Sequence, residues 1–179
     1  VILNGKARAY GLEVLLKKNE GKLKGWLAYT LSKSEQLTAG RTSNEPGINS
    51  GKWYNSPYDK THDFSINANY QLNKKWEFNA NFVFQTGQPT NYPVGQYEIQ
   101  GLNVPIFNDN TRNADRLPAY HRLDVSATLT PEKNLKRKWQ GEWVFGIYNL
   151  YGRQNAASIN FKQNRETLKN EALQASIFG

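Results

Sequence analysis

The chain has 179 residues, and its 38% hydrophobic and 13% aromatic content excludes an intrinsically disordered protein. It contains no cysteine, which excludes disulfide frameworks, thiol nucleophiles and cysteine metal sites. No apolar run is long enough for a transmembrane helix. The mean hydropathy of -0.75 still allows a membrane barrel, because a barrel strand turns only every second residue to lipid.

The formal net charge of +8 is compatible with nucleic acid, anionic lipid headgroups or no charged partner. The densest basic cluster contains Lys133, Lys136, Arg137 and Lys138 and falls in a predicted turn. A solvated turn explains it better than a nucleic-acid patch, so we predict no nucleic-acid partner.

The first two predicted strands cover residues 7–18 and 23–34, joined by a tight turn in which Gly21 can adopt a positive φ. Apolar residues alternate with polar ones in both strands. Trp26 is the exception, because it falls on the more polar face.

Residues 63–72 and 76–86 alternate on either side of Asn73, Lys74 and Lys75, which predicts a hairpin. The residues predicted to face lipid are Phe64, Ile66, Tyr70, Trp76, Phe78, Phe82 and Phe84. The residues predicted to line a lumen from the other face are Asn67, Asn69, Asn79 and Asn81. A soluble sandwich would place the apolar face in a protein core, and this hairpin alone does not decide between the two.

Two further strands are predicted at residues 120–129 and 139–150. Arg122 and Asp124 share one face of the first, where they can pair in a wet lumen. An arginine turned to lipid would cost about 2 to 4 kcal/mol near the bilayer midplane, so we predict that this face lines the lumen.

The segments 35–61, 87–118 and 151–179 show no sustained periodicity and are predicted to be long extracellular loops. Within the last one, residues 158–161 and 173–178 are expected to form a short hairpin. Short and long connections alternate, as in an outer-membrane barrel, and two long structureless loops would be unusual in a compact soluble domain.

The predicted fold is therefore all-β, an antiparallel up-and-down transmembrane β-barrel segment of about six or seven strands in the bacterial outer membrane. So few strands leave open edges in lipid, and other strands of a longer polypeptide are expected to complete the ring.

Four motifs then become informative together: YDKTH at 58–62, TGQP at 86–89, RLPAYHRLDV at 116–125 and YNLYGRQNA at 148–156. Their order and spacing resemble the C-terminal barrel of TonB-dependent outer-membrane receptors of the Bacteroidota type, including receptors with a carboxypeptidase-regulatory-like domain. This resemblance implies a 22-stranded barrel with a plug, which imports a scarce ligand with energy supplied by TonB. It also implies lipopolysaccharide as a neighbour, a surface lipoprotein as a possible lid, and a plug and TonB-binding segment outside this sequence.

Aromatic side chains in the two central loops are candidates for stacking on a small-molecule, glycan or peptide ligand. They are Trp53, Tyr54, Tyr58, Tyr92, Tyr97 and Phe107. The alternative is that they only pack the loops against one another.

The sequence offers little for catalysis, and we predict no enzyme, no cofactor and no metal site. Asp59 and His62 are two ligand types at short spacing, but a metal site needs three or four, so hydrogen bonding is the favoured role. Two other functions remain open: a passive barrel or surface adhesin, and a soluble all-β binding module.

Overall fold

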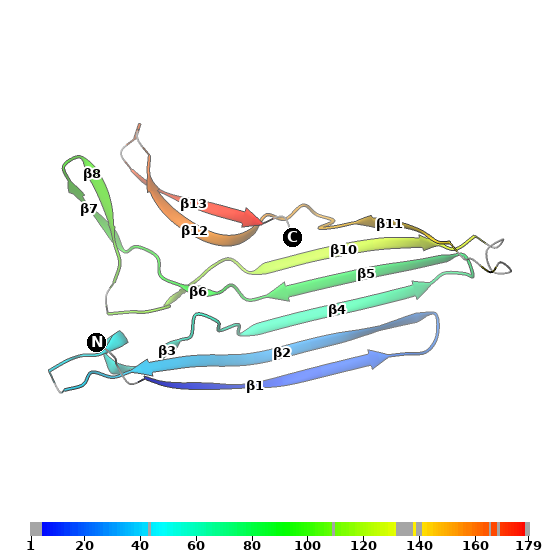
Figure 1. The fold of residues 1–179 in the computed structure, drawn as a ribbon, viewed down its shortest axis with the longest axis horizontal. Coiled ribbons are helices and arrows are strands. Elements are labelled where there is room, and N and C mark those ends of the chain that lie inside the picture. Colours follow the sequence, from blue (N-terminus) through cyan, green and yellow to red (C-terminus); the bar gives the residue numbers. More distant parts are fainter. Residues whose placement is uncertain are drawn as a thin grey trace.

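The computed structural model describes residues 5–42, 44–108, 110–131, 138, 141–164, 166–167 and 169–177, and the chain is all-β. The main sheet contains β1 (Gly5–Lys18), β2 (Leu23–Thr38), β4 (His62–Gln71), β5 (Trp76–Gln85), β10 (Tyr120–Leu129) and β11 (Trp143–Ile147). These strands lie side by side in that order, each antiparallel to the next (Figure 1). The predicted all-β, antiparallel fold is confirmed.

Further elements lie between the strands of the main sheet and after β11. These are the 3₁₀ turn η1 (Ile48–Gly51), β3 (Tyr54–Asn55), β6 (Pro89–Thr90), β7 (Gly95–Ile99), β8 (Leu102–Ile106), β9 (Asp115–Arg116), β12 (Asn155–Gln163) and β13 (Asn170–Ile177). β3 joins the edge of β2, while β6 pairs with β9, β7 with β8 and β12 with β13. Within the described residues, no helix has the length and apolar character needed to cross a bilayer.

The strand register sorts side chains onto two faces. Asn67 lies opposite Asn81, which in turn lies opposite Asp124. One residue further along β5, Phe82 lies opposite Ile66 and Leu123. Because neighbouring residues on a strand point to opposite sides, polar and apolar rows alternate across the whole sheet. Trp26 lies opposite Asn67, on the polar face, as its sequence position predicted.

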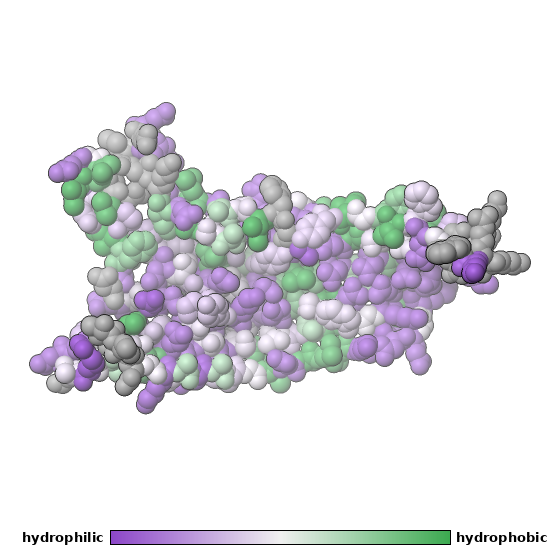
Figure 2. Space-filling view, in the orientation of Figure 1, coloured by the Kyte–Doolittle hydropathy of each residue, from purple (hydrophilic) through white to green (hydrophobic). Residues whose placement is uncertain are grey.

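None of the described residues forms a second layer over either face of this sheet. Among the described residues, Tyr54 is the one buried apolar side chain, at 7% exposure. The chain exposes 12962 Å² to solvent, whereas a compact monomer of 20.5 kDa would expose about 8900 Å². Hydrophilic side chains cover much of the sheet face turned to the viewer in Figure 2. The described part of the chain therefore has no hydrophobic core of its own.

Most of the predicted strand limits differ from the observed ones by a few residues. Residues 120–129 are both the predicted and the observed range of β10. The predicted 139–150 strand is observed as Trp143–Ile147, and residues 139 and 140 lie outside the described residues. β2 continues to Thr38 instead of ending at 34, because Glu35 and Gln36 pair with both β1 and β3.

The prediction of structureless segments at 35–61 and 87–118 is wrong. The first contains η1 and β3, and the second contains β6 to β9. Two-residue strands pair through backbone groups alone and leave no side-chain period to detect. The β7–β8 hairpin did leave one, because apolar residues alternate on both sides of its turn at Gln100 and Gly101, which have positive φ angles of 52° and 77°.

The hairpin expected at 158–161 and 173–178 is present and longer, as β12 and β13. Phe178 lies outside the described residues.

The close approach of β2 to β4 depends on Gly25. It has a φ of 152°, and a Cβ atom built on it would meet the Asn67 carbonyl oxygen at 2.0 Å. We expect Gly25→Ala to lower the free energy of unfolding by at least about 2 kcal/mol, from backbone strain plus the clash. Urea unfolding followed by tryptophan fluorescence would measure it.

The matched control is Gly146→Ala in β11, where the nearest atom to a new Cβ is at 3.6 Å. This variant should unfold at the same urea concentration as the unaltered protein. Equal effects of the two substitutions would contradict the observed close approach.

Candidate ligand-binding end of the sheet

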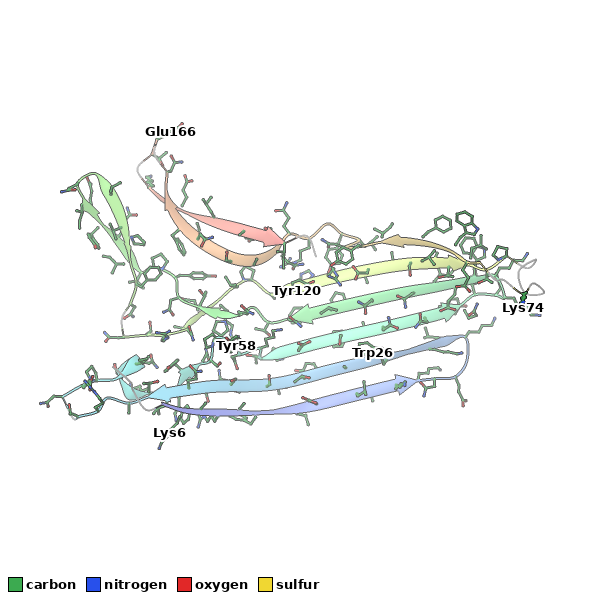
Figure 3. All side chains as sticks on the ribbon, in the orientation of Figure 1. Lys6, Trp26, Tyr58, Lys74, Tyr120 and Glu166 are labelled. Carbon is green, nitrogen blue, oxygen red and sulfur yellow. The ribbon has the colours of Figure 1, made fainter. Side chains whose placement is uncertain are left out.

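The two ends of the sheet differ in their connections. β1–β2 and β4–β5 are joined by short turns at one end, and the chain segments 39–61, 86–119 and 148–154 gather at the other (Figure 1). The hairpins β7–β8 and β12–β13 also belong to this second end, which we call the loop end. In Figure 3, Lys74 marks the turn end, and Tyr58 and Glu166 lie toward the loop end.

A buried ion pair joins two of the loops. The Asp59 carboxylate is completely buried and accepts a hydrogen bond from the Ser34 backbone N–H at 2.5 Å and another from the Arg116 guanidinium. Arg116 also donates to the Asp59 carbonyl at 3.2 Å and to the Gly87 carbonyl at 3.0 Å. One guanidinium therefore holds the β2–β4 connection against the β5–β10 connection.

Asp59 and His62, the pair considered as metal ligands, have hydrogen-bonding partners instead. His62 Nδ1 lies 2.9 Å from the Tyr29 hydroxyl, across the β2–β4 ladder. No group of three or more His, Asp or Glu side chains suited to a metal gathers within the part of the chain that the structure describes. The hydrogen-bonding interpretation of these two residues is confirmed.

A second set of side-chain hydrogen bonds fixes the start of β10. The Asn155 amide is completely buried, donates to the His121 carbonyl at 3.1 Å and accepts from the His121 backbone N–H at 3.1 Å. Arg153 donates to the Ala119 carbonyl at 2.9 Å, and Asn149 donates to the Arg153 carbonyl at 2.9 Å. Side chains from the 148–156 motif thus replace strand pairing where β11 has ended.

The predicted pairing of Arg122 with Asp124 is confirmed, with Arg122 Nε 3.0 Å from Asp124 Oδ2. Arg122 also donates to the hydroxyls of Tyr120 and Tyr148, and its guanidinium lies over the Tyr148 ring. The other Asp124 oxygen accepts from the Asn149 backbone N–H at 2.9 Å. The charges of this pair are thus surrounded by polar partners on one face.

The amides predicted to line a lumen form a ladder along the same face. Asn79 donates to Asn69 at 2.6 Å, and Asn69 donates to Asn67 at 3.0 Å. Nearer the loop end, Lys60 donates to Gln85 at 2.8 Å, and Gln85 donates to Asp63 at 2.9 Å. The polar face therefore carries two hydrogen-bonded series, one of asparagines and one of Lys60, Gln85 and Asp63 nearer the loop end.

A cavity of about 280 Å³ opens beside the second series, between the ends of the central strands and the β12–β13 hairpin. Lys60, Gln85, Tyr120, Leu117 and Ile177 are among its lining residues. It combines one cation, two amides, a hydroxyl and a phenol with apolar walls, which suits a small polar ligand or one end of a larger ligand.

Three of the six candidate loop aromatics are buried or half-buried and contact other residues of the protein. Tyr54 is buried, with its hydroxyl 3.1 Å from that of Thr38. The Tyr92 hydroxyl donates to the Arg116 carbonyl at 2.8 Å, and the Trp53 ring lies under the Arg8 guanidinium at 4.2 Å. Burial of the Tyr92 phenol, with the negative charge of Asp115 nearby, raises its pKa above the usual value of 10.0.

The other three candidates are exposed: Tyr58 at 82%, Tyr97 at 46% and Phe107 at 43%. Tyr97 belongs to β7, and Phe107 follows β8 directly. The structure thus divides the six aromatics into a packed group and a group whose rings a ligand can reach.

No protein-family model, curated protein or solved structure matches this chain.

The Asp59–Arg116 pair should carry much of the loop end's stability. We expect Asp59→Asn to lower the free energy of unfolding by about 3 kcal/mol, because it removes one partner of a buried, hydrogen-bonded ion pair. Urea unfolding would measure the change, and limited proteolysis within residues 39–61 would report loosening of the loop.

Arg41→Gln is the control, since it removes an exposed ion pair with Glu45. It should leave the unfolding midpoint unchanged. An unaltered midpoint in both variants would show that the Asp59–Arg116 pair does not hold the loops together.

Proposed function

We propose that this chain is part of an outer-membrane β-barrel that captures a scarce ligand at its loop end and imports it with energy supplied through TonB. The observation that carries the proposal is an open, single-layer sheet with one apolar and one polar face and no second layer over either. A soluble β domain buries the apolar face of its sheet against another layer.

The apolar face has the features of a surface in contact with hydrocarbon. Tyr70 and Phe78 are 42% and 41% exposed, and Trp76 stacks beside Phe78 with ring centroids 6.2 Å apart. Tyr70 and Trp76 flank the β4–β5 turn, where an aromatic girdle would meet lipid headgroups. Phe64, Ile66, Phe82 and Phe84 continue the apolar face toward the loop end.

The polar face suits enclosed water. Its asparagines form hydrogen bonds with one another and Arg122 pairs with Asp124, and the same groups would be costly against lipid. Because β1 and β11 each pair on one side only within the described residues, a closed ring needs further strands, which we assign to the same polypeptide.

The import step is supported by the loop end and by the four motifs that resemble TonB-dependent receptors. Three of those motifs supply the hydrogen-bonded connections made by Asp59, Arg116, Arg153 and Asn155. The exposed rings of Tyr58, Tyr97 and Phe107 offer stacking surfaces for a glycan, peptide or other small ligand. Lipopolysaccharide would surround the loop end, a surface lipoprotein is a candidate lid, and TonB would act through a plug.

The assignment of faces can be tested with two neighbouring residues of β5. Phe82→Arg should reduce the stability of the protein folded in phospholipid vesicles by about 2 to 4 kcal/mol, whereas Asn81→Arg should change it little. The measurement is urea titration in vesicles, with heat-modifiable electrophoretic mobility reporting the folded fraction.

A soluble all-β module gives the opposite result. The native polypeptide would then remain in solution without detergent, and it would not fold into phospholipid vesicles. Either finding would refute the membrane proposal.

Active import can be separated from passive passage once a thermal-shift screen of glycans, peptides and chelated metals has supplied a ligand. Uptake should stop when a protonophore collapses the proton gradient. Tyr58→Ala should weaken binding about tenfold through loss of ring stacking, and Tyr10→Ala, on the apolar face of β1, should not. Uptake that persists without the gradient would favour a passive barrel, and binding without uptake would favour an adhesin.

A further inference from the structure

A row of small residues crosses the apolar face near its turn end. Gly25 in β2, Ala68 in β4 and Ala80 in β5 lie opposite one another in successive ladders. Larger side chains border this row on both sides: Leu27, Ile66 and Phe82 on one, Leu23, Tyr70 and Phe78 on the other. The small residues therefore form the floor of a trough that runs across the strands.

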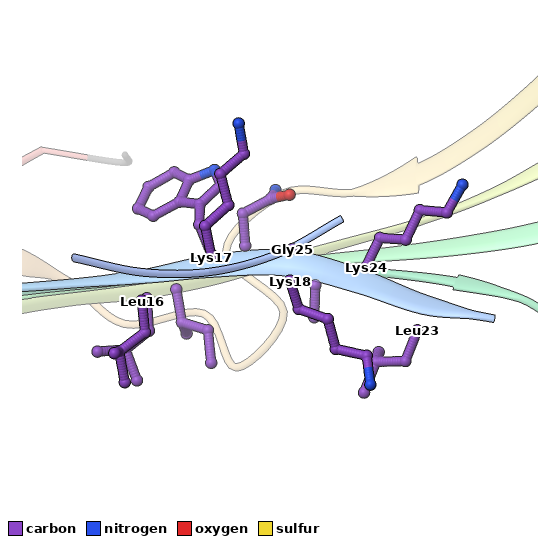
Figure 4. A pocket seen from close by; sticks show the side chains of 11 residues that line it. Leu16, Lys17, Lys18, Leu23, Lys24 and Gly25 are labelled. Atoms are coloured by element: carbon purple, nitrogen blue, oxygen red, sulfur yellow. The ribbon is translucent and has the colours of Figure 1, made fainter. Parts of the chain in front are cut away.

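Two cavities lie along this row. One of about 270 Å³ is lined by Leu16, Leu23, Leu27 and Ala68, among others (Figure 4). The other, of about 260 Å³, is lined by Ala68, Tyr70, Phe78, Ala80 and Val125, together with Asn79 and Ser126. Ala68 borders both cavities, so they lie next to each other on the apolar face.

The depth of the trough depends on Gly25. A Cβ atom at this position would reach the Asn67 carbonyl, so no other residue allows β2 to approach β4 in this way. The lack of space for a side chain at Gly25 therefore also leaves the trough unfilled at this position.

Lys18 closes one end of the row. It lies opposite Gly25 and is the last residue of β1. In Figure 4 the Lys18 side chain lies on the same side of the sheet as Leu16 and Leu23, while Lys17 and Lys24 extend from the other side. No carboxylate among the described residues forms an ion pair with Lys18.

The β1 end of the trough lies nearer the turns than its β5 end. β1 ends at Lys18, within the row, but β4 continues three residues past Ala68, to Gln71, and β5 begins four residues before Ala80, at Trp76. The three turns are neighbours, because the Gln71 N–H donates to the Lys22 carbonyl and the Thr130 N–H donates to the Lys75 carbonyl. The trough thus starts at the level of the turns and reaches deeper along the apolar face.

The turn end is also basic. Lys17, Lys18, Lys22, Lys24, Lys74, Lys75 and Lys138 all lie in or beside its turns. Clustered lysines beside a membrane surface attract anionic headgroups, each contributing to the local positive potential.

We propose that this trough binds one acyl chain of an anionic glycerophospholipid, whose headgroup phosphate is held by Lys18. The cation lies at the level of the turns and the apolar trough extends from it toward the depth of the bilayer, which matches the order of groups in such a lipid. This inference rests on the proposed membrane function, because only a protein in a bilayer presents this face to lipid.

The test uses the native polypeptide that carries this chain, purified in a nonionic detergent and titrated with phosphatidylglycerol. Native mass spectrometry counts the lipid retained. Lys18→Gln should weaken binding about fivefold, as expected for one lysine near an anionic headgroup. Ala68→Leu should weaken it on the order of tenfold, by displacing about two methylene groups of the acyl chain.

Each variant has a matched control. Lys17→Gln removes the neighbouring charge on the opposite face, and Ala127→Leu adds the same volume to the apolar face outside the residues that line the trough. Both should retain phosphatidylglycerol within about twofold of the unaltered protein, because the Lys17 side chain extends from the other side of the sheet and Ala127 lines neither cavity. Zwitterionic phosphatidylcholine should bind more weakly and respond to Ala68→Leu but not to Lys18→Gln.

The outcomes separate the two proposals. If the polypeptide needs detergent but all four variants bind phosphatidylglycerol alike, the trough is not a lipid site and the membrane function stands. Equal losses in Lys17→Gln and Lys18→Gln would also overturn it, because nonspecific charge would then explain the binding. A detergent-solubilised dimer that Ala68→Leu dissociates would assign the trough to a second copy, and a water-soluble polypeptide would overturn both proposals.

Discussion

The structure depends on the pairing of six antiparallel strands in a register that sends every second side chain to the same face. Within the described residues, no second layer covers either face. In most domains the apolar side of a sheet is buried by another layer of the same chain, which supplies the main favourable free energy of folding. Here that contribution has to come from the surroundings of the sheet. The large exposed area and the absence of a core in the described residues are two expressions of this one property.

The two ends of the sheet are built by different interactions. At the loop end, buried polar side chains organise the chain: Asp59 and Arg116 connect two loops, and Arg153 and Asn155 fix the backbone at the start of β10. At the turn end the connections are short, and lysines collect around them. A protein with this asymmetry presents a shaped, polar surface on one side and a simple basic rim on the other.

These hydrogen-bonded connections also give a physical meaning to the motifs. Residues 58–62 and 116–125 contain the two partners of the buried ion pair, and residues 148–156 contain the amides and guanidinium that replace strand pairing beyond β11. We expect such residues to tolerate few substitutions, because the side chain of each makes at least two hydrogen bonds. A family resemblance carried by them reflects the construction of the loop end more than its choice of ligand.

The sequence by itself determined the strand class, the two faces and the Arg122–Asp124 pairing, because the period-2 pattern and the two-residue spacing are local properties of an extended chain. It placed β10 within its observed bounds and missed β3, β6 and β9, whose pairing comes from backbone contacts between residues far apart in the chain. It also missed the local β7–β8 hairpin, although that hairpin has an alternating pattern. Which loop aromatics pack and which stay open, and the trough between Lys18 and Ala80, were decided only by the tertiary structure. Both depend on which residues lie opposite one another across strands, and no local pattern encodes that register before the turns and hydrogen-bonded connections have set it.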